Sequence, residues 1–213
     1  KDPDAVRPGQ MLRNFRSLLG HRAYTGYLLS CTFSYSGLFA FISGSSFVFI
    51  QVFGLSADQY GFCFAAAVVG YMTGTQIGGR MVTSRGIQAM VLWGTAVNAL
   101  AGIVMLGLAL GGVHHFLAVL LPMMLYMVGM GLVLPNALAG AIGPFPRMAG
   151  AASSLTGSCQ YGVAAGVGLA VGHGFNSTQM PMATAICAMG IGGLLAYRML
   201  VHGTADPAEN AAD

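Results

Sequence analysis

The chain has 213 residues, of which only 7% are charged, and its nine Lys and Arg against six Asp and Glu give a formal net charge of +3. Hydrophobic residues make up 55% of the chain, and the mean hydropathy is +0.70. A soluble domain carries about 25% charged residues because its surface must be hydrated, so this composition excludes an ordinary soluble fold. The cations flank apolar segments, where they face water or lipid head groups, so the positive charge does not indicate a nucleic-acid partner.

Long stretches without any charged residue indicate membrane-spanning helices. The uncharged runs cover residues 23–57, 59–79, 86–146 and 148–197. Because a helix that crosses the hydrocarbon core needs about 20 mostly apolar residues, these runs have room for one, one, two and two spans. The sequence therefore predicts an all-α integral membrane protein with six transmembrane helices, at 24–49, 60–79, 88–111, 116–141, 148–172 and 180–199.

Local signals support these boundaries. Ser56 follows a glycine turn and is a suitable N-cap for the second span. The pair Gly111-Gly112 divides the longest uncharged run, and the segment 143–147, with two prolines, ends the fourth span. The short connections leave no extramembrane domain and require neighbouring helices to run antiparallel.

The distribution of Lys and Arg predicts the orientation. All nine fall in alternate connections, and the connections around Asp58, His114 and His173 contain none. Since cytoplasmic loops hold the basic residues of membrane proteins, both termini are expected in the cytoplasm, with segments 1–23 and 200–213 on that side.

Glycine spacing identifies two helices that should pack closely. Gly70, Gly74 and Gly78 recur every four residues in the second predicted span, and Gly162 and Gly166 do so in the fifth. Small residues at this spacing let two backbones approach, which drives helix association in lipid. We therefore expect both helices to lie at tight interfaces.

The first predicted span carries many hydroxyl and aromatic side chains, which are not expected on a lipid-facing helix. Tyr35, Phe39 and Ser43 share one helical face. Two interpretations stay open: the hydroxyls bond back to the preceding turn and the aromatics fill the bundle, or this face lines a cavity.

The fourth predicted span contains Pro122 and Pro135, and Tyr126 and Met130 share a face between them. Proline in a transmembrane helix frees a carbonyl group and bends the axis, which is tolerated beside a cavity or neighbouring helices. Met is most often core filler, but its flexible thioether also suits ligands of many shapes. The mid-membrane position makes Tyr126 and Met130 candidates for ligand contact.

Several function classes lack support. No nucleophile motif, H-E-x-x-H motif or phosphate-binding loop occurs, so the sequence predicts neither an enzyme nor a nucleotide-driven pump. The loop histidines are expected to be solvated and the four cysteines to pack in the core, so no metal, disulfide or cofactor is predicted. No Asp, Glu, Lys or Arg lies well inside a span, so groups that couple transport to ions are expected elsewhere.

Three segments resemble a known transporter family. They are GLFAFISGSSFVFIQVFGLS at 37–56, GTQIGGR at 74–80 and LVLPNALAGAIGPFPRMAG at 132–150. The chain is similar from about residue 11 to residue 199 to the second half of major facilitator superfamily multidrug exporters of the Bcr/CflA (bicyclomycin/chloramphenicol resistance) type.

This resemblance implies helices seven to twelve of a twelve-helix transporter in the bacterial inner membrane, with 1–23 as its central cytoplasmic loop. It implies two inverted three-helix repeats, 24–111 and 116–199. It also implies export of drug-like or amphipathic molecules by alternating access, with proton antiport and an N-terminal transporter half as partner. The residues expected to line the substrate path are Tyr35, Phe39, Ser43, Tyr126, Met130 and Gln160.

One motif departs from the family pattern. The family's loop between the second and third helices resembles G-x-x-x-D-R-x-G-R, whereas residues 78–86 keep Arg80 and Arg85 without the acid. A charge-relay gate is therefore not expected in this loop. A stand-alone six-span channel, or an assembly partner of a separate N-terminal half, is the alternative interpretation.

Overall fold

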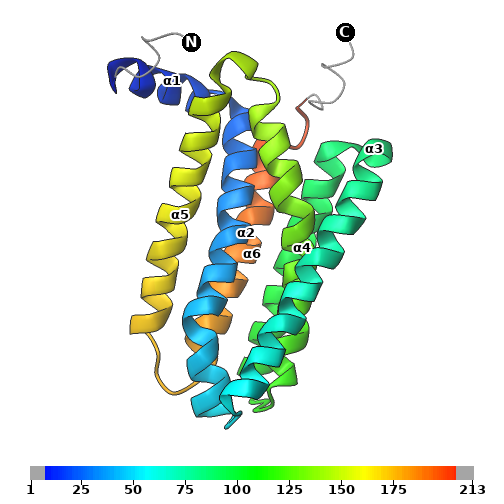
Figure 1. The fold of residues 1–213 in the computed structure, drawn as a ribbon, viewed down its shortest axis with the longest axis vertical. Helices are drawn as coiled ribbons and strands as arrows, with labels where there is room; N and C mark the ends of the chain where they lie inside the picture. Colours follow the sequence, from blue (N-terminus) through cyan, green and yellow to red (C-terminus); the bar gives the residue numbers. More distant parts are fainter. Residues whose placement is uncertain (1–7, 205–213) are drawn as a thin grey trace.

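The computed structural model describes residues 8–204, and these residues fold into an elongated helical bundle (Figure 1). The main helices are α1 (Pro8–Gly20), α2 (Arg22–Ser46), α3 (Ala57–Leu110), α4 (Leu117–Ile142), α5 (Ala149–His173) and α6 (Met180–Leu200). α2 continues as a π-helical segment, η2 (Phe47–Val52), and a short 3-10 turn, η3 (Pro146–Met148), precedes α5. The segment predicted as a loop before the first span thus contains a helix of its own, α1.

α3 is a helical hairpin although it runs for 54 residues without a gap. Gly86 interrupts it with φ 78° and ψ 166°, a backbone conformation that favours glycine because it lacks a Cβ atom. Figure 1 shows the chain turning back at this end of α3. The first arm (residues 57–85) and the second arm (residues 87–110) contain the segments predicted as the second and third spans.

Four helices are long and apolar enough to cross a membrane: α2 with η2, α3, α4 and α6. α5 has 25 residues, a length similar to that of α4, but it is rich in Gly, Ala and Ser and falls outside this set. The positions of the helices agree with the six predicted segments, whereas the count of six membrane spans stays a prediction.

The predicted boundary chemistry is confirmed at the start of α3. The Gln59 backbone N–H donates to Ser56 Oγ at 3.3 Å, and the Ser56 N–H donates to Gln59 Oε1 at 3.0 Å, which completes a capping box. At the other end of α3, Gly112 has φ 70° and ends the second arm before α4 begins. Both connections are therefore specified locally.

The helices differ in how many neighbours they have. α4 packs on both arms of α3 and on α2, and α6 packs between α2 and α3. α5 packs chiefly on α2 and lies at one side of the bundle (Figure 1). α1 lies across the end of the bundle, transverse to the other helices, so only α1 departs from the common axis.

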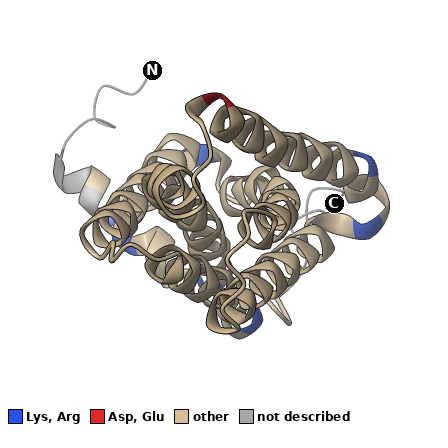
Figure 2. Cartoon of the chain, turned by 90° about the horizontal axis from the view of Figure 1, so that it is seen from below, with Lys and Arg blue, Asp and Glu red and all other residues tan. Residues whose placement is uncertain are grey.

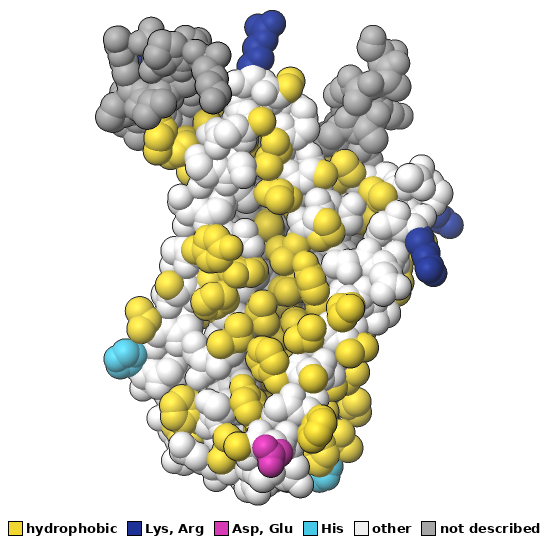
Figure 3. All heavy atoms as spheres, in the orientation of Figure 1, with side chains coloured by type: hydrophobic (Ala, Val, Ile, Leu, Met, Phe, Trp, Pro, Cys, Tyr) yellow, Lys and Arg dark blue, Asp and Glu magenta, His cyan; other side chains and the backbone are white. Residues whose placement is uncertain are grey.

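The charged side chains separate by end. Lys and Arg gather at the end of the bundle near α1 and the α3 turn, whereas Asp58, in the first turn of α3, lies at the opposite end (Figure 3). No Lys, Arg, Asp or Glu is buried among the described residues, and Figure 2 shows how few residues of the cartoon are charged. This is the separation expected from the alternating connections.

The predicted glycine interface exists for the first arm of α3. A Cβ atom added at Gly70 would lie 2.5 Å from the Met124 carbonyl oxygen of α4, and one added at Gly74 would overlap the Val128 carbonyl oxygen. At Gly78 the nearest atom would be Asn136 Nδ2, 3.3 Å away. Only glycine permits this close approach of the two backbones.

In α5, the glycines that were expected at a tight interface do not face another helix of the described chain. A Cβ atom at Gly162 or Gly166 would find no atom within 4 Å, so neither residue packs against another helix of the described chain. Gly168 is the α5 glycine that approaches a neighbour, because its Cβ atom would lie 2.7 Å from Ser43 Oγ of α2. Sequence spacing identified the small residues of α5 without showing which face meets α2.

Candidate functional site

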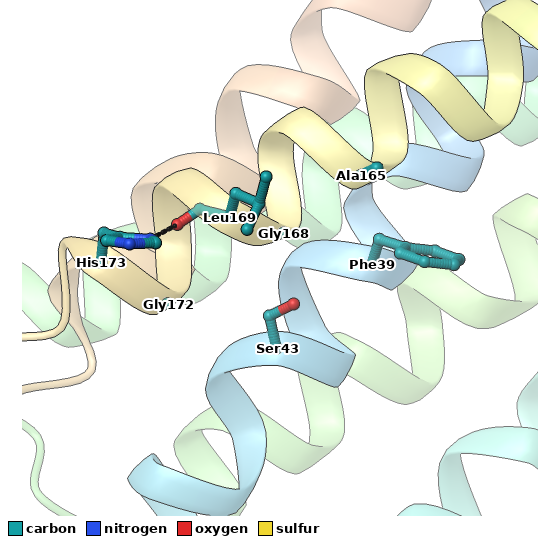
Figure 4. A pocket seen from close by; sticks show the side chains of 7 residues that line it. All are labelled: Phe39, Ser43, Ala165, Gly168, Leu169, Gly172 and His173. Carbon is teal, nitrogen blue, oxygen red and sulfur yellow. Dashed lines mark hydrogen bonds between the residues drawn. The ribbon is translucent and has the colours of Figure 1, made fainter.

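A pocket of about 510 Å³ lies between α2 and α5. Its lining comes from two turns of each helix and is mostly apolar (Figure 4): Phe39, Ser43, Ala165, Gly168, Leu169, Gly172 and His173. Ligand pockets in proteins are of this size and combine apolar walls with a few polar groups. Two of the sequence-predicted residues, Phe39 and Ser43, are part of this pocket.

Small residues of α5 create the space. Gly168 stands opposite the Ser43 hydroxyl, and a Cβ atom on Gly172 would meet nothing within 4 Å. Larger residues at these positions would place side chains in the space between α2 and α5. The pocket therefore depends on glycine at positions 168 and 172 of α5.

Aromatic rings extend the same face of α2. The Tyr35 ring lies 5.1 Å from that of Phe39 and 5.4 Å from that of Tyr161 on α5, where the two rings are perpendicular. Edge-to-face pairs of this kind add about 0.5–1.5 kcal/mol beyond the buried area. Because Tyr161 is 61% exposed, this pair offers ring surface to a molecule that approaches α5.

Sequence analysis missed Tyr161, although its neighbour Gln160 was among the predicted residues. Gln160 lies on α5 and is partly buried, but it is not among the residues that line the pocket. An aromatic side chain within a helix of small residues was the available signal for Tyr161. The sequence alone could not show which side of α5 faces α2, because this depends on how the two helices pack.

Tyr126 and Met130 lie elsewhere, in the interior beside α2. Tyr126 is 0% exposed and Met130 is 3% exposed, and both belong to the main hydrophobic cluster. The Tyr126 hydroxyl donates to the Ser34 carbonyl oxygen at 3.2 Å. Its ring tip occupies the space that a Cβ atom at Gly37 would need. In this conformation the two residues pack in the interior beside α2 and do not line the pocket with Phe39 and Ser43.

A second polar contact fixes α2 at the same level. Asn98, on the second arm of α3, donates through Nδ2 to Ser34 Oγ at 2.9 Å, and both residues are buried. Gly129 of α4 leaves the space in which the side-chain oxygen Oδ1 of Asn98 lies. α2 is therefore held against α3 and α4 by polar contacts, which the sequence pattern did not reveal.

The polar groups of the pocket are few. Ser43 provides a hydroxyl, and the ring of His173 contacts the Leu169 carbonyl oxygen of its own helix, with Nδ1 at 3.0 Å (Figure 4). The part of the chain that the structure describes holds no group of three His, Cys, Asp or Glu residues able to bind a metal ion. This chemistry suits an apolar or aromatic ligand with few hydrogen-bonding groups.

Comparison with known proteins gives three relatives. The chain is 32% identical over 199 residues to the bicyclomycin resistance protein homolog of Haemophilus influenzae, and this match covers 92% of the chain. It is 29% identical to multidrug resistance protein D of Escherichia coli, over 74% of the chain. It is 27% identical to the MFS-type transporter YdgK of Bacillus subtilis, over 89% of the chain.

The chain spans about half the length of the relatives that it matches, because the three alignments cover 49%, 46% and 39% of those proteins. Neither a family model nor a solved structure matches the chain. The relatives therefore extend well beyond the region that they share with this chain.

Proposed function

The chain belongs to the major facilitator superfamily, a family of membrane transporters and not of enzymes, and from this premise we propose that it is the C-terminal half of a drug exporter. In this proposal the half contributes six membrane spans to a twelve-helix protein that works by alternating access. The names of two relatives, which refer to bicyclomycin and multidrug resistance, support small drug-like molecules as the substrates.

The proposed spans are α2, the two arms of α3, α4, α5 and α6. Gly86 supports the division of α3 because it turns the helix back at the Arg-rich end. With the bundle axis across the membrane, the Arg-rich end faces the cytoplasm under the positive-inside rule. The proposed inverted repeats relate residues 24–111 to 116–199, so that α2 corresponds to α4 and the first arm of α3 corresponds to α5.

The proposed N-terminal half packs on the open side of α5. A Cβ atom added at Gly162 or Gly166 would meet nothing within 4 Å, while Tyr161 and Leu169 of the same helix are more than 60% exposed. A ridge of small residues is suited to close helix packing in lipid. The proposal gives these glycines the packing role that the described chain alone does not provide.

The pocket between α2 and α5 is the observation that carries the proposed substrate site. It joins Phe39 and Ser43 to an apolar cavity beside the ring pair Tyr35–Tyr161. Substrate would stack on Tyr35 and Phe39 and receive a hydrogen bond from Ser43, with Gln160 near the path on α5. Tyr126 and Met130 act indirectly in this proposal, by holding α2 in position.

Proton antiport is proposed as the source of energy, with its titratable groups in the N-terminal half. The described bundle buries no Asp, Glu, Lys or Arg, and intramembrane proton relays are usually built from such residues. Drug uptake by inverted membrane vesicles that contain the intact protein should therefore stop when a protonophore removes the gradient. Continued uptake in the absence of a gradient would contradict this part of the proposal.

Antibiotic susceptibility tests the substrate site. Cells that lack their own exporters should express the intact protein with Tyr35→Ala or Phe39→Ala at normal levels. Loss of one ring contact should lower resistance to at least one drug by about two- to tenfold, as expected from the energy of an aromatic pair.

Phe62→Ala is the matched control because Phe62 is an exposed ring on α3, 77% accessible and away from the α2–α5 pocket. It should leave the resistance profile unchanged. If both α2 variants retain full resistance to every drug tested, or if Phe62→Ala lowers resistance equally, the pocket is not the substrate site.

A further inference from the structure

One buried hydroxyl group of α2 has no hydrogen-bond partner within the described chain. Thr32 is 1% exposed, and its Oγ1 atom neither donates to nor accepts from another described group. The usual partner of a threonine in a helix is the carbonyl oxygen four residues earlier, which for Thr32 is that of Leu28. An unpaired polar group away from water costs free energy, so this hydroxyl requires an explanation.

The other buried serine and threonine hydroxyls of the described chain are all paired. Ser30 donates to the Gly26 carbonyl oxygen at 2.8 Å, and Ser36 donates to the Thr32 carbonyl oxygen at 2.8 Å. The remaining members of this set bond to their own helix or to a neighbouring one: Ser34, Ser45, Thr95 and Thr156. Thr32 therefore differs from residues of the same chemistry and the same burial.

Thr32 lies on the side of α2 that carries the pocket residues. Seven residues separate it from Phe39 and eleven from Ser43, which are close to two and three helical turns. Tyr35, whose ring meets that of Tyr161 on α5, follows Thr32 by one turn. The hydroxyl therefore continues the α5-facing side of α2 beyond the pocket, toward the Arg-rich end.

α5 lies over this side of α2. The two helices run in the same direction from the end that bears α1 (Figure 1), and Tyr35 faces Tyr161 while Ser43 stands opposite Gly168. The α5 turn at residues 157–160 is therefore at the level of Thr32. Because α5 packs chiefly on α2, a displacement of α5 alone would uncover this side of α2.

We infer that Thr32 is a further substrate-binding residue, whose hydroxyl is unpaired here because its partner is a polar group of the substrate. This role rests on the proposed function of the α2–α5 pocket and adds a position to it. In the proposed orientation Thr32 lies on the cytoplasmic side of the pocket. An exported molecule therefore reaches Thr32 before Phe39 and Ser43, once α5 has moved away from α2.

The surroundings of the hydroxyl define the ligand. Thr32 is one turn, about 5 Å along the helix axis, from Tyr35, on whose ring the substrate is proposed to stack. A hydroxyl both donates and accepts, so it suits a hydroxyl, amide or carbonyl group. No Lys, Arg, Asp or Glu is buried in the described bundle to pair with a charged ligand. The substrate class is therefore a neutral aromatic molecule with a hydrogen-bonding group about 5 Å from its ring.

Drug binding by Thr32→Val tests the inference, because valine is close to threonine in shape but lacks the hydroxyl. The probe is radiolabelled chloramphenicol, a neutral molecule with an aromatic ring, hydroxyl groups and an amide, offered to the purified intact protein in detergent. Loss of one hydrogen bond should weaken equilibrium binding by about two- to tenfold. Thr32→Ser keeps the hydroxyl and should bind chloramphenicol as the unmodified protein does.

Thr95→Val is the matched control, since Thr95 is 0% exposed and its hydroxyl donates to the Val91 carbonyl oxygen at 2.8 Å. It should leave chloramphenicol binding unchanged. The melting temperature without drug separates binding from structure, because Thr32→Val removes no hydrogen bond of the described chain and should not lower it. Normal binding by Thr32→Val, or an equal loss of binding in Thr95→Val, overturns the inference.

Thiol protection provides a second measurement in case Thr32→Val does not fold. Every native cysteine is first replaced by alanine, and Thr32→Cys or Ser30→Cys is then introduced. Thr32→Cys should react with a membrane-permeant maleimide, at a rate that saturating chloramphenicol lowers severalfold. Ser30 is 0% exposed and paired within α2, so Ser30→Cys should stay unreactive. A Thr32→Cys protein that does not react, or whose rate chloramphenicol does not change, overturns the inference.

Failure of this inference differs from failure of the proposed pocket. If the pocket is wrong, Tyr35→Ala and Phe39→Ala should both bind chloramphenicol normally. If only the role of Thr32 is wrong, Phe39→Ala should bind more weakly while Thr32→Val binds normally.

Discussion

The first arm of α3 and α5 are both rich in glycine, yet they contact their neighbours in different ways. At Gly70 and Gly74 the α3 backbone lies directly against carbonyl groups of α4, with no space for a methyl group. α5 approaches α2 at Gly168 and leaves a pocket beside this contact, while Gly162 and Gly166 face open space. A glycine ridge can therefore join two helices or leave room between them.

The difference follows from what stands opposite each glycine. Backbone carbonyls of α4 cannot rotate away, so the α3–α4 contact is fixed once it forms. Opposite α5 stand the side chains of Tyr35, Phe39 and Ser43, which can change rotamer. In the alternating-access mechanism proposed above, we expect α3 and α4 to move as one body.

The largest effect is expected from a substitution that disrupts the contact between α3 and α4. Gly74→Ala would place a methyl group on the Val128 carbonyl oxygen, and overpacking of this kind costs about 1–3 kcal/mol. The melting temperature of the chain in detergent should fall by about 2–12 °C, since 1 kcal/mol corresponds to about 2–4 °C for a domain of this size. Scanning fluorimetry with a thiol-reactive dye would measure it.

Gly107→Ala is the control for this substitution, because Gly107 lies on the second arm of α3 and a Cβ atom there meets nothing within 4 Å. Its melting temperature should stay the same or rise slightly, as alanine favours a helix. Equal melting temperatures for Gly74→Ala and Gly107→Ala would show that α3 and α4 are not in close backbone contact.

A smaller effect concerns the polar contact that holds α2. Asn98→Ala and Ser34→Ala each remove one partner of the 2.9 Å hydrogen bond. Each single variant should lose about 1 kcal/mol, with a coupling energy of about 0.6 kcal/mol in the double-mutant cycle, as is usual for hydrogen bonds inside membranes. Additive losses in denaturation experiments would show that the two side chains do not interact.

The smallest effect is expected on the open side of α5. Gly166→Ala should change the melting temperature of this chain by no more than Gly107→Ala does, because both added methyl groups meet empty space. In the intact protein the same change should lower the melting temperature, since the N-terminal half is proposed to pack there. A clear loss already in this chain would mean that α5 packs differently from the described arrangement.

The sequence predicted the helices well because charge placement, hydropathy and capping act locally. Ser56, Gly86 and Gly112 each stand at a boundary that a few residues determine. The rotation of each helix about its axis depends on its neighbours, and it could not be predicted from spacing alone. The sequence therefore did not show that the Tyr126 hydroxyl contacts the α2 backbone or that Tyr161 faces Tyr35.

The most direct test of the central claim fills the pocket without disturbing the fold. Gly172 lines the pocket, and a Cβ atom there meets nothing within 4 Å, so Gly172→Leu should place a side chain in the substrate space. Equilibrium binding of a radiolabelled drug substrate to the purified intact protein should weaken severalfold, while Gly107→Leu binds normally. Unchanged drug binding in Gly172→Leu at an unchanged melting temperature would contradict the assignment of the α2–α5 pocket as the substrate site.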